Sequence, residues 1–115
     1  MKYSYICSMN ERESHIAKMI GDRIRTKDPN AEVILFGSHA RGQANEESDW
    51  DILILIDKPK TNRSVEETYR DEIFELELEL GEPISTIIYS KSDWETRYIF
   101  SPLYKNIKKE GLKIA

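Results

Sequence analysis

The sequence is poor in cysteine, because Cys7 is the only one among its 115 residues. A single thiol cannot form an internal disulfide, which excludes a fold that depends on disulfides. Long apolar runs are missing too, since the longest, from Ile52 to Ile56, is far too short to cross a bilayer. The first residues also lack the apolar core of a signal peptide. We therefore expect a cytoplasmic protein with no membrane-spanning segment.

An excess of positive charge is likewise missing. The chain has 17 Lys and Arg against 21 Asp and Glu, a net charge of −4. Proteins dedicated to duplex nucleic acid usually present a basic surface, so this balance argues against that class. Hydrophobic residues make up 39% and charged residues 33% of the chain, as in soluble globular proteins. The length, without a repeat or linker, predicts one domain over residues 1–115.

Capping boxes predict where three helices start. In such a box a short polar side chain accepts a hydrogen bond from the N–H three residues later, and a Glu at that position reaches back. Apolar residues at helical spacing follow the first two boxes. The pairs that fit are Asn10 with Glu13, Ser64 with Glu67, and Ser92 with Glu95.

The segment Glu75–Leu80 fits two structures. Its strict alternation of Glu and Leu is typical of a strand, but the apolar stripe that begins at Val65 continues through it at helical spacing. We favour a helix, because Gly81 supplies a stop. Pro102 interrupts the chain before a last helical stretch, Leu103–Glu110.

Three apolar runs predict buried strands. They are Val33–Phe36, Asp51–Ile56 and Ile84–Tyr89. Strands that alternate with helices predict an α/β or α+β domain in which the helices pack on a small sheet.

A glycine-flanked serine turn, Gly37-Ser38-His39-Ala40-Arg41-Gly42, follows the first of these strands. Glycine permits a positive φ and lets a ligand approach the backbone closely. If a helix starts just after Ser38, its free N–H groups face an anion, and the Ser38 hydroxyl and Arg41 add two further donors. The turn therefore predicts a phosphate-binding element. A steric role in an ordinary strand-to-helix turn is the alternative.

Two aspartates open the second strand, in Ser48-Asp49-Trp50-Asp51. Side chains two residues apart on an extended chain point to the same side, so both carboxylates can converge on one metal. Carboxylate oxygens suit Mg²⁺, which takes its remaining ligands from water and substrate phosphates. The alternative is a pair of turn aspartates that cap the strand. Trp50 is expected on the opposite side, in the core.

Together these motifs resemble the signature of the DNA polymerase β-like nucleotidyltransferase superfamily, and specifically its small stand-alone minimal nucleotidyltransferases. The resemblance extends over most of the chain, from the leading helix to the tail 101–111. It implies a nucleotidyltransferase-like fold: a small mixed sheet with helices on one side. The implied reaction transfers a nucleoside monophosphate, AMP as the favoured case, from an NTP such as ATP to an acceptor hydroxyl.

The resemblance also assigns roles to residues. Gly37 and Ser38 would hold the terminal phosphates, and Asp49 and Asp51 would be the catalytic residues that hold two Mg²⁺ ions, with Mn²⁺ as an alternative. The remaining nucleotide- and phosphate-binding positions in the signature are Arg41, Gly42 and Ser48. His39, inside the signature, would contact phosphate or the acceptor, or be a variable residue at the helix start.

One position departs from the pattern. Active members of the superfamily generally carry a third acidic residue on the strand after the long helix, where this chain has Ser85. A hydroxyl is a much weaker Mg²⁺ ligand than a carboxylate. Three explanations remain open: Glu79 or Glu82 takes its place, a partner supplies the acid, or the site binds nucleotide without efficient transfer.

Similar minimal proteins are often the antitoxin of a pair with a HEPN-domain toxin, whose tyrosine they can adenylylate. The resemblance therefore implies a HEPN-domain partner. Two other functions compete with this enzyme. One is a nucleotide-binding or partner-binding module weakened by the loss of the third acid. The other is the nucleotide-binding domain of a two-part small-molecule transferase, whose helical substrate domain this chain lacks. The sequence leaves the base, the acceptor and the oligomeric state open.

Overall fold

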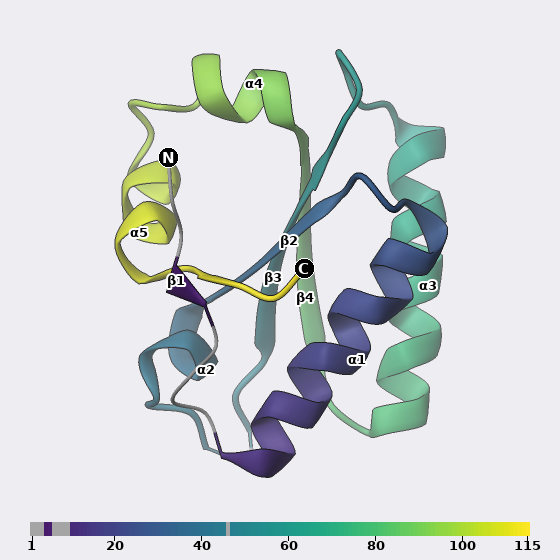
Figure 1. Ribbon diagram of the computed structural model, residues 1–115, viewed down its shortest axis with the longest axis vertical. Coiled ribbons are helices and arrows are strands. Elements are labelled where there is room, and N and C mark those ends of the chain that lie inside the picture. Colours follow the sequence, from purple (N-terminus) through teal and green to yellow (C-terminus); the bar gives the residue numbers. More distant parts are fainter. Residues whose placement is uncertain (1–3, 6–9, 46) are drawn as a thin grey trace.

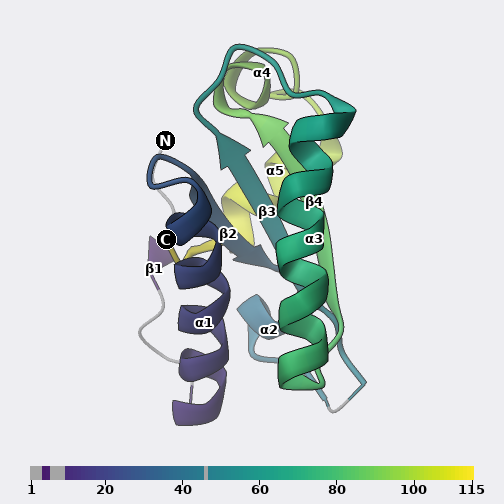
Figure 2. The same cartoon turned by 90° about the vertical axis from the view of Figure 1, so that its right-hand side faces the viewer.

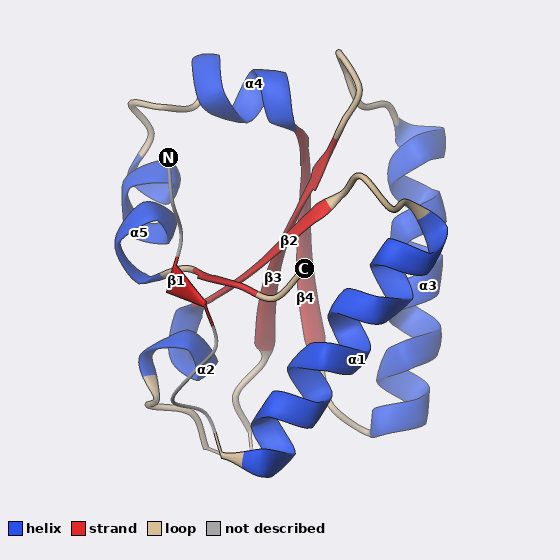
Figure 3. Ribbon diagram, in the orientation of Figure 1, coloured by secondary structure: helices blue, strands red, loops and turns tan. Residues whose placement is uncertain are grey.

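The computed structural model describes residues 4–5, 10–45 and 47–115 of the chain. A five-stranded sheet, in the order β1-β5-β2-β3-β4, runs through this part of the protein (Figures 1 and 3). Its strands are β1 (Ser4–Tyr5), β2 (Glu32–Phe36), β3 (Trp50–Ile56), β4 (Ile84–Ser90) and β5 (Leu112–Lys113). The three predicted strands are confirmed as β2, β3 and β4, each to within one residue at one end.

The strands run in both directions, so the sheet is mixed, as the resemblance implied. β2 is antiparallel to both β3 and β5, whereas β3 is parallel to β4 and β1 is parallel to β5. A parallel pair needs a crossover connection, and α3 supplies it between β3 and β4.

Helices cover both faces of the sheet, which corrects the expectation of helices on one side. α1 (Glu11–Lys27) and α3 (Arg63–Leu80) lie side by side on one face (Figure 2). α4 (Lys91–Thr96) and α5 (Pro102–Glu110) pack against the other face, and the short α2 (Gly37–Arg41) follows β2. None of the described helices combines the length and apolarity needed to cross a membrane.

β3 explains why both faces are covered. Ile52, Ile54 and the neighbouring Trp50 pack in the cluster that contains the buried residues of α1 and α3. Leu53 and Leu55 pack in a second cluster, with side chains of α4 and α5. From Ile52 to Ile56 β3 is apolar at every position, so both of its faces are buried there, whereas alternation with polar residues would have left one face to solvent.

Two of the predicted helix starts are wrong by two residues. α3 is capped by Asn62, whose Oδ1 accepts from Val65 N at 2.9 Å, and not by Ser64. α4 is capped by Ser90, whose Oγ accepts from Asp93 N at 3.0 Å, and not by Ser92. In each case an earlier residue of a good capping type has the extended backbone that a cap requires.

The other helix boundaries follow the expected chemistry. Asn10 caps α1 by accepting from Glu13 N at 2.8 Å, as predicted. Glu75–Leu80 is helical, and Gly81 ends α3 with its N–H donated to Glu77 O at 2.8 Å. Pro102 begins α5 and does not interrupt it, because the first helical position needs no N–H donor.

The sequence did not predict β5, which lies between β1 and β2 in the sheet. It spans only two residues and therefore has no periodicity to recognise. Its pairing with β2 places the chain that follows α5 in the sheet, where Leu112 lies opposite Leu35.

Candidate functional site

The first turn of α2 packs directly on β3. Gly37 has a φ of +76°, and β-pairing of Phe36 with Asp51 places it beside the Asp51 side chain. A Cβ on residue 37 would lie 2.1 Å from Asp51 Oδ2 and 3.0 Å from its Cγ. Only glycine fits there, because both the positive φ and the close approach exclude a side chain. The turn and the acidic strand, separate in the sequence, therefore form one surface.

The Asp51 carboxyl lies in a crowded electrostatic environment. Burial raises its pKa, and the negative charge of Asp49 raises it further. Electrostatic interaction with His39 and Arg41 lowers the pKa of Asp51, and interaction with Glu110 raises it. Ionised Asp51 is therefore held near other carboxylates at a cost in free energy, which a bound cation would relieve.

The two aspartates differ in their surroundings. Asp51 is half-buried within β3, and Asp49 is exposed just before the strand begins. Asp51 has the same strand parity as Leu53, so its side chain lies on the face covered by α4 and α5. Across the described residues no group of three or more His, Cys, Asp or Glu side chains is arranged to hold a metal ion.

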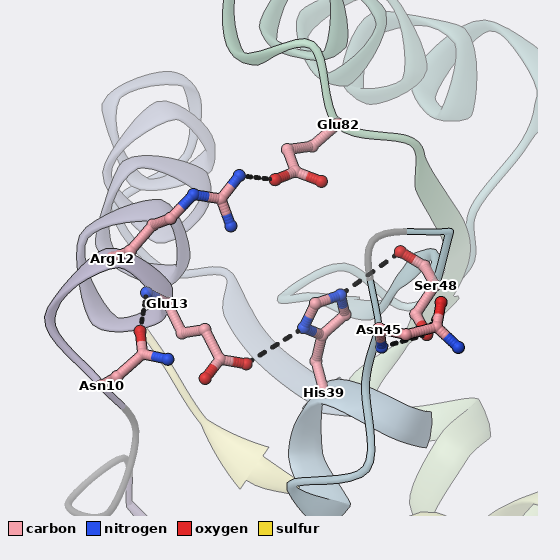
Figure 4. Close-up of polar contacts among 7 residues, drawn as sticks. All are labelled: Asn10, Arg12, Glu13, His39, Asn45, Ser48 and Glu82. Carbon is pink, nitrogen blue, oxygen red and sulfur yellow. Dashed lines mark hydrogen bonds and ion pairs between the residues drawn. The ribbon is translucent and has the colours of Figure 1, made fainter.

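Ser85 is the neighbour of Asp51 on the adjacent strand. The parallel register of β3 and β4 pairs these two residues, and the Ser85 side chain is exposed. The alternative acids are paired elsewhere: Glu79 accepts from Arg23 Nη2 at 2.7 and 2.9 Å, and Glu82 is hydrogen-bonded to Arg12 (Figure 4). Both arginines belong to α1, which covers the other face of the sheet.

The other residues of the glycine–serine turn lie in α2 or directly after it. Ser38 is half-buried in α2, and Gly42 ends that helix with a φ of +71°. The exposed Arg41 is already engaged, because its Nε donates to Gln43 Oε1 at 3.1 Å and its Nη1 to Glu110 Oε2 at 3.0 Å.

Ser48 and His39 belong to a neighbouring polar network (Figure 4). The Ser48 hydroxyl accepts from Asn45 N at 3.0 Å, and its carbonyl oxygen lies 3.3 Å from His39 Nε2. His39 is buried, its ring is stacked on Trp50 at 3.9 Å, and its Nδ1 lies 3.3 Å from Glu13 Oε2. His39 is thus a packing residue in this structure, which neither sequence-based interpretation foresaw. Trp50 is buried in the core as expected.

His39 also forms part of the wall of a polar pocket of about 590 Å³. The pocket lies between the start of α1 and the loops that precede β3 and β4, and Asn10, Arg12 and Glu82 line it as well (Figure 4). Its lining residues do not include Gly37, Asp49 or Asp51. The polar pocket and the Gly37–Asp51 surface are therefore two distinct features of the described chain.

Glu110 also lies at this surface, although nothing in the sequence indicated it. Its Oε2 accepts from Gly37 N at 2.6 Å and from Arg41 Nη1 at 3.0 Å. In the sequence Glu110 is only the last residue of an apolar-striped helix, 73 positions from Gly37. No local pattern could identify it, because the contact depends on where α5 ends in space.

Substitution of Gly37 tests the close approach to Asp51. Gly81→Ala is the matched control, since Gly81 has a φ of +68° but nothing within 4 Å of a Cβ. Both variants bear the cost of a left-handed alanine, about 1–2 kcal/mol. Gly37→Ala should lose about 1–3 kcal/mol more, because it also overpacks against Asp51. Urea unfolding measures the difference, and equal losses would show that the Asp51 side chain moves aside freely.

Substitution of Asp51 tests the electrostatic environment. The pKa of Asp51 is raised in the folded protein, so folding favours the protonated carboxyl over the ionised one. The resulting contribution to the free energy of unfolding is fully present at low pH and is lost as pH rises through the folded-state pKa. In metal-free buffer at pH 7, Asp51→Asn should therefore raise Tm by roughly 2–4 °C. The gain should vanish below the ordinary Asp pKa of 3.8. Thermal unfolding at several pH values measures this, with the exposed Asp57→Asn as control. A lower Tm at pH 7 would contradict it.

Comparison with known proteins identifies the family of this chain. Residues 17–114 match the family described as nucleotidyltransferase domain. A relative from Methanocaldococcus jannaschii, named as a candidate protein adenylyltransferase, is 40% identical over 67 residues, or 57% of this chain and 66% of the relative. The chain thus spans slightly less than two thirds of that relative's length.

Two solved structures share the fold. One is a toxin–antitoxin crystal structure with AMP-PNP, with a TM-score of 0.63 and 18% identity over 87% of this chain and 72% of the other. The second, a candidate nucleotidyltransferase from Sulfolobus solfataricus, has a TM-score of 0.57 and 23% identity over 89% and 78% of the two chains. The family match spans more than half of the sequence and the fold agrees with it, so this chain belongs to the nucleotidyltransferase domain family.

Proposed function

We propose that this protein transfers AMP from ATP to an acceptor hydroxyl in a Mg²⁺-dependent reaction. The proposal rests on one observation above all, the packing of the Gly37 turn on the Asp51 carboxylate. This contact joins a backbone turn suited to phosphate with an acid suited to a divalent metal. Membership of the nucleotidyltransferase domain family supports the same reaction type.

We further propose that the acceptor hydroxyl lies on a protein partner, a HEPN-domain toxin for which this chain is the antitoxin. The name of the Methanocaldococcus jannaschii relative, a candidate protein adenylyltransferase, supports a protein acceptor and AMP as the transferred group. The toxin–antitoxin structure with AMP-PNP supports a toxin partner and an adenine nucleotide.

The residues present fit a divalent metal at Asp51. Its carboxylate is half-buried, is repelled by the charge of Asp49, and borders the space that a Cβ on residue 37 would fill. Asp49 and Asp51 would hold Mg²⁺, with Mn²⁺ as the alternative ion. When bound, two such ions would activate the acceptor oxygen and neutralise charge on the phosphates and the leaving pyrophosphate.

The chain's own residues would bind and orient the nucleotide. The Ser38 hydroxyl and the N–H groups that follow Gly37 would donate to the terminal phosphates, and Gly37 would leave room for them. Gly42 ends the short helix, and Arg41 and Ser48 would complete the polar surroundings. Attack by the acceptor can be direct and in line, so no protein side chain need form a covalent intermediate.

A second function is favoured by Ser85. This hydroxyl lies beside Asp51, at the position where the resemblance to the superfamily implies a third acid, and Glu79 and Glu82 are engaged by arginines of α1. A site with only two carboxylates would hold the acceptor-activating metal weakly. On this alternative the protein is a nucleotide-binding or partner-binding module that neutralises its partner by contact.

Loss of both aspartates tests transfer. With labelled ATP, Mg²⁺ and a HEPN-domain partner, the wild type should label the partner. Asp49→Asn with Asp51→Asn should reduce labelling at least ~100-fold and leave association with the partner intact, because the metal site is lost. Asp57→Asn, an exposed acid after the far end of β3, is the control and should label normally. A wild type that silences its partner without labelling it would support the second function instead.

A gain-of-function substitution tests the importance of the missing acid. Ser85→Asp places a carboxylate beside Asp51 and should increase Mn²⁺ affinity about 10-fold or more, with faster transfer. Ser92→Asp adds the same charge at an exposed position of α4 and is the matched control. Calorimetric titration with Mn²⁺ provides the measurement. If both variants bind Mn²⁺ like the wild type, the third acid is not what limits this site.

A further inference from the structure

We propose that Glu110 is a positioning residue of the nucleotide-binding turn, and that its carboxylate holds the Gly37 backbone and Arg41 in place beside Asp51. This inference rests on the proposed function, because the turn matters only if it binds a nucleotide. It assigns a role at the site to the last residue of α5.

The contacts of Glu110 with the turn are specific. One carboxylate oxygen, Oε2, accepts from both Gly37 N, at 2.6 Å, and Arg41 Nη1, at 3.0 Å. The Glu110 side chain is only 22% exposed, so these charge-assisted bonds are partly shielded from water. The same oxygen thereby joins the first and last residues of α2.

The residues that follow Glu110 in the chain determine its position beside Gly37. A Cβ on Gly111 would lie 2.5 Å from Ile107 O and 2.9 Å from Ile34 Cγ2, so only glycine lets the chain leave α5 this close to β2. Leu112 then pairs with Leu35, one residue before Phe36. As a result the end of α5 lies against α2, as Figure 1 shows at the left of the sheet.

Gly37 is therefore constrained from two directions. On one side its Cα faces the Asp51 carboxylate without room for a Cβ, and on the other its N–H is fixed by Glu110. Glycine has the largest backbone freedom to lose, so an unanchored Gly37 would sample other conformations and move the Ser38 donors. Glu110 limits this motion before any nucleotide arrives.

The charges around the turn are consistent with this role. A carboxylate close to Asp51 and to bound phosphates would be repulsive by itself, and Glu110 indeed raises the pKa of Asp51. Arg41 is ion-paired to Glu110 and lowers that pKa. The pair is close to neutral, so it can hold the turn while adding little net charge.

Two substitutions separate the effect of the length of the Glu110 side chain from that of its charge. Glu110→Asp keeps the charge but shortens the side chain by one methylene, whereas Glu110→Gln keeps the length and an acceptor oxygen. If Glu110 positions the turn, Glu110→Asp should weaken binding of ATP with Mg²⁺ about 10-fold or more, and Glu110→Gln should stay within about 3-fold of the wild type. Glu95→Ala is the control, since Glu95 belongs to α4 and its carboxylate accepts from Tyr104 OH of α5 at 2.9 Å, whereas Gly37 N donates to Glu110.

A second readout does not depend on nucleotide. Amide hydrogen exchange of Gly37, followed by NMR in the free protein, should be slow in the wild type, in Glu110→Gln and in Glu95→Ala, and at least 10-fold faster in Glu110→Asp. The proposal is overturned if Glu110→Asp retains both ATP affinity and Gly37 protection, or if Glu110→Gln is the variant that loses them. Failure of the wild type to bind ATP would overturn the proposed function instead. Amide hydrogen exchange of Gly37 would still test whether Glu110 holds the turn in place.

Discussion

The site depends on the contact between residue 37 and the acidic strand. β2 and β3 pair antiparallel so that Phe36 lies opposite Asp51, and the next residue must turn out of the sheet across the Asp51 side chain. A backbone with a φ of +76° and no Cβ makes that turn without displacing the carboxylate. The turn proposed to bind phosphate and the acid proposed to bind metal are therefore packed against each other at one corner of the sheet.

Burial on both faces of the sheet holds this corner in place. β3 lies between β2 and β4, and its apolar residues pack alternately into the cluster under α1 and α3 and the cluster under α4 and α5. Close packing of this kind leaves little room for the strand to shift its register. Asp51 immediately precedes the buried apolar residues Ile52–Ile56 and is itself only half-buried, so it lies at the boundary between the core and solvent.

Several negative charges lie close to Asp51, and a bound cation would reduce their mutual repulsion. Burial raises the pKa of Asp51, and the nearby charges of Asp49 and Glu110 raise it as well, whereas His39 and Arg41 act in the opposite direction. Binding sites commonly hold such unfavourable arrangements because the bound ion or substrate supplies the missing interaction. Ser85 beside Asp51 reduces this repulsion and, by the same chemistry, reduces the capacity to hold a cation.

Local chemistry in the sequence determined the three longest strands, the helical state of Glu75–Leu80 and the identity of the glycine–serine turn, because periodicity, caps and glycine act over a few residues. Two helix starts were misplaced because neighbouring residues of equal capping ability compete, and only packing chooses between them. Tertiary structure alone decided the burial of His39 and the contact of Glu110 with Gly37, 73 residues away. Such contacts depend on how whole elements pack, which no short stretch of sequence encodes.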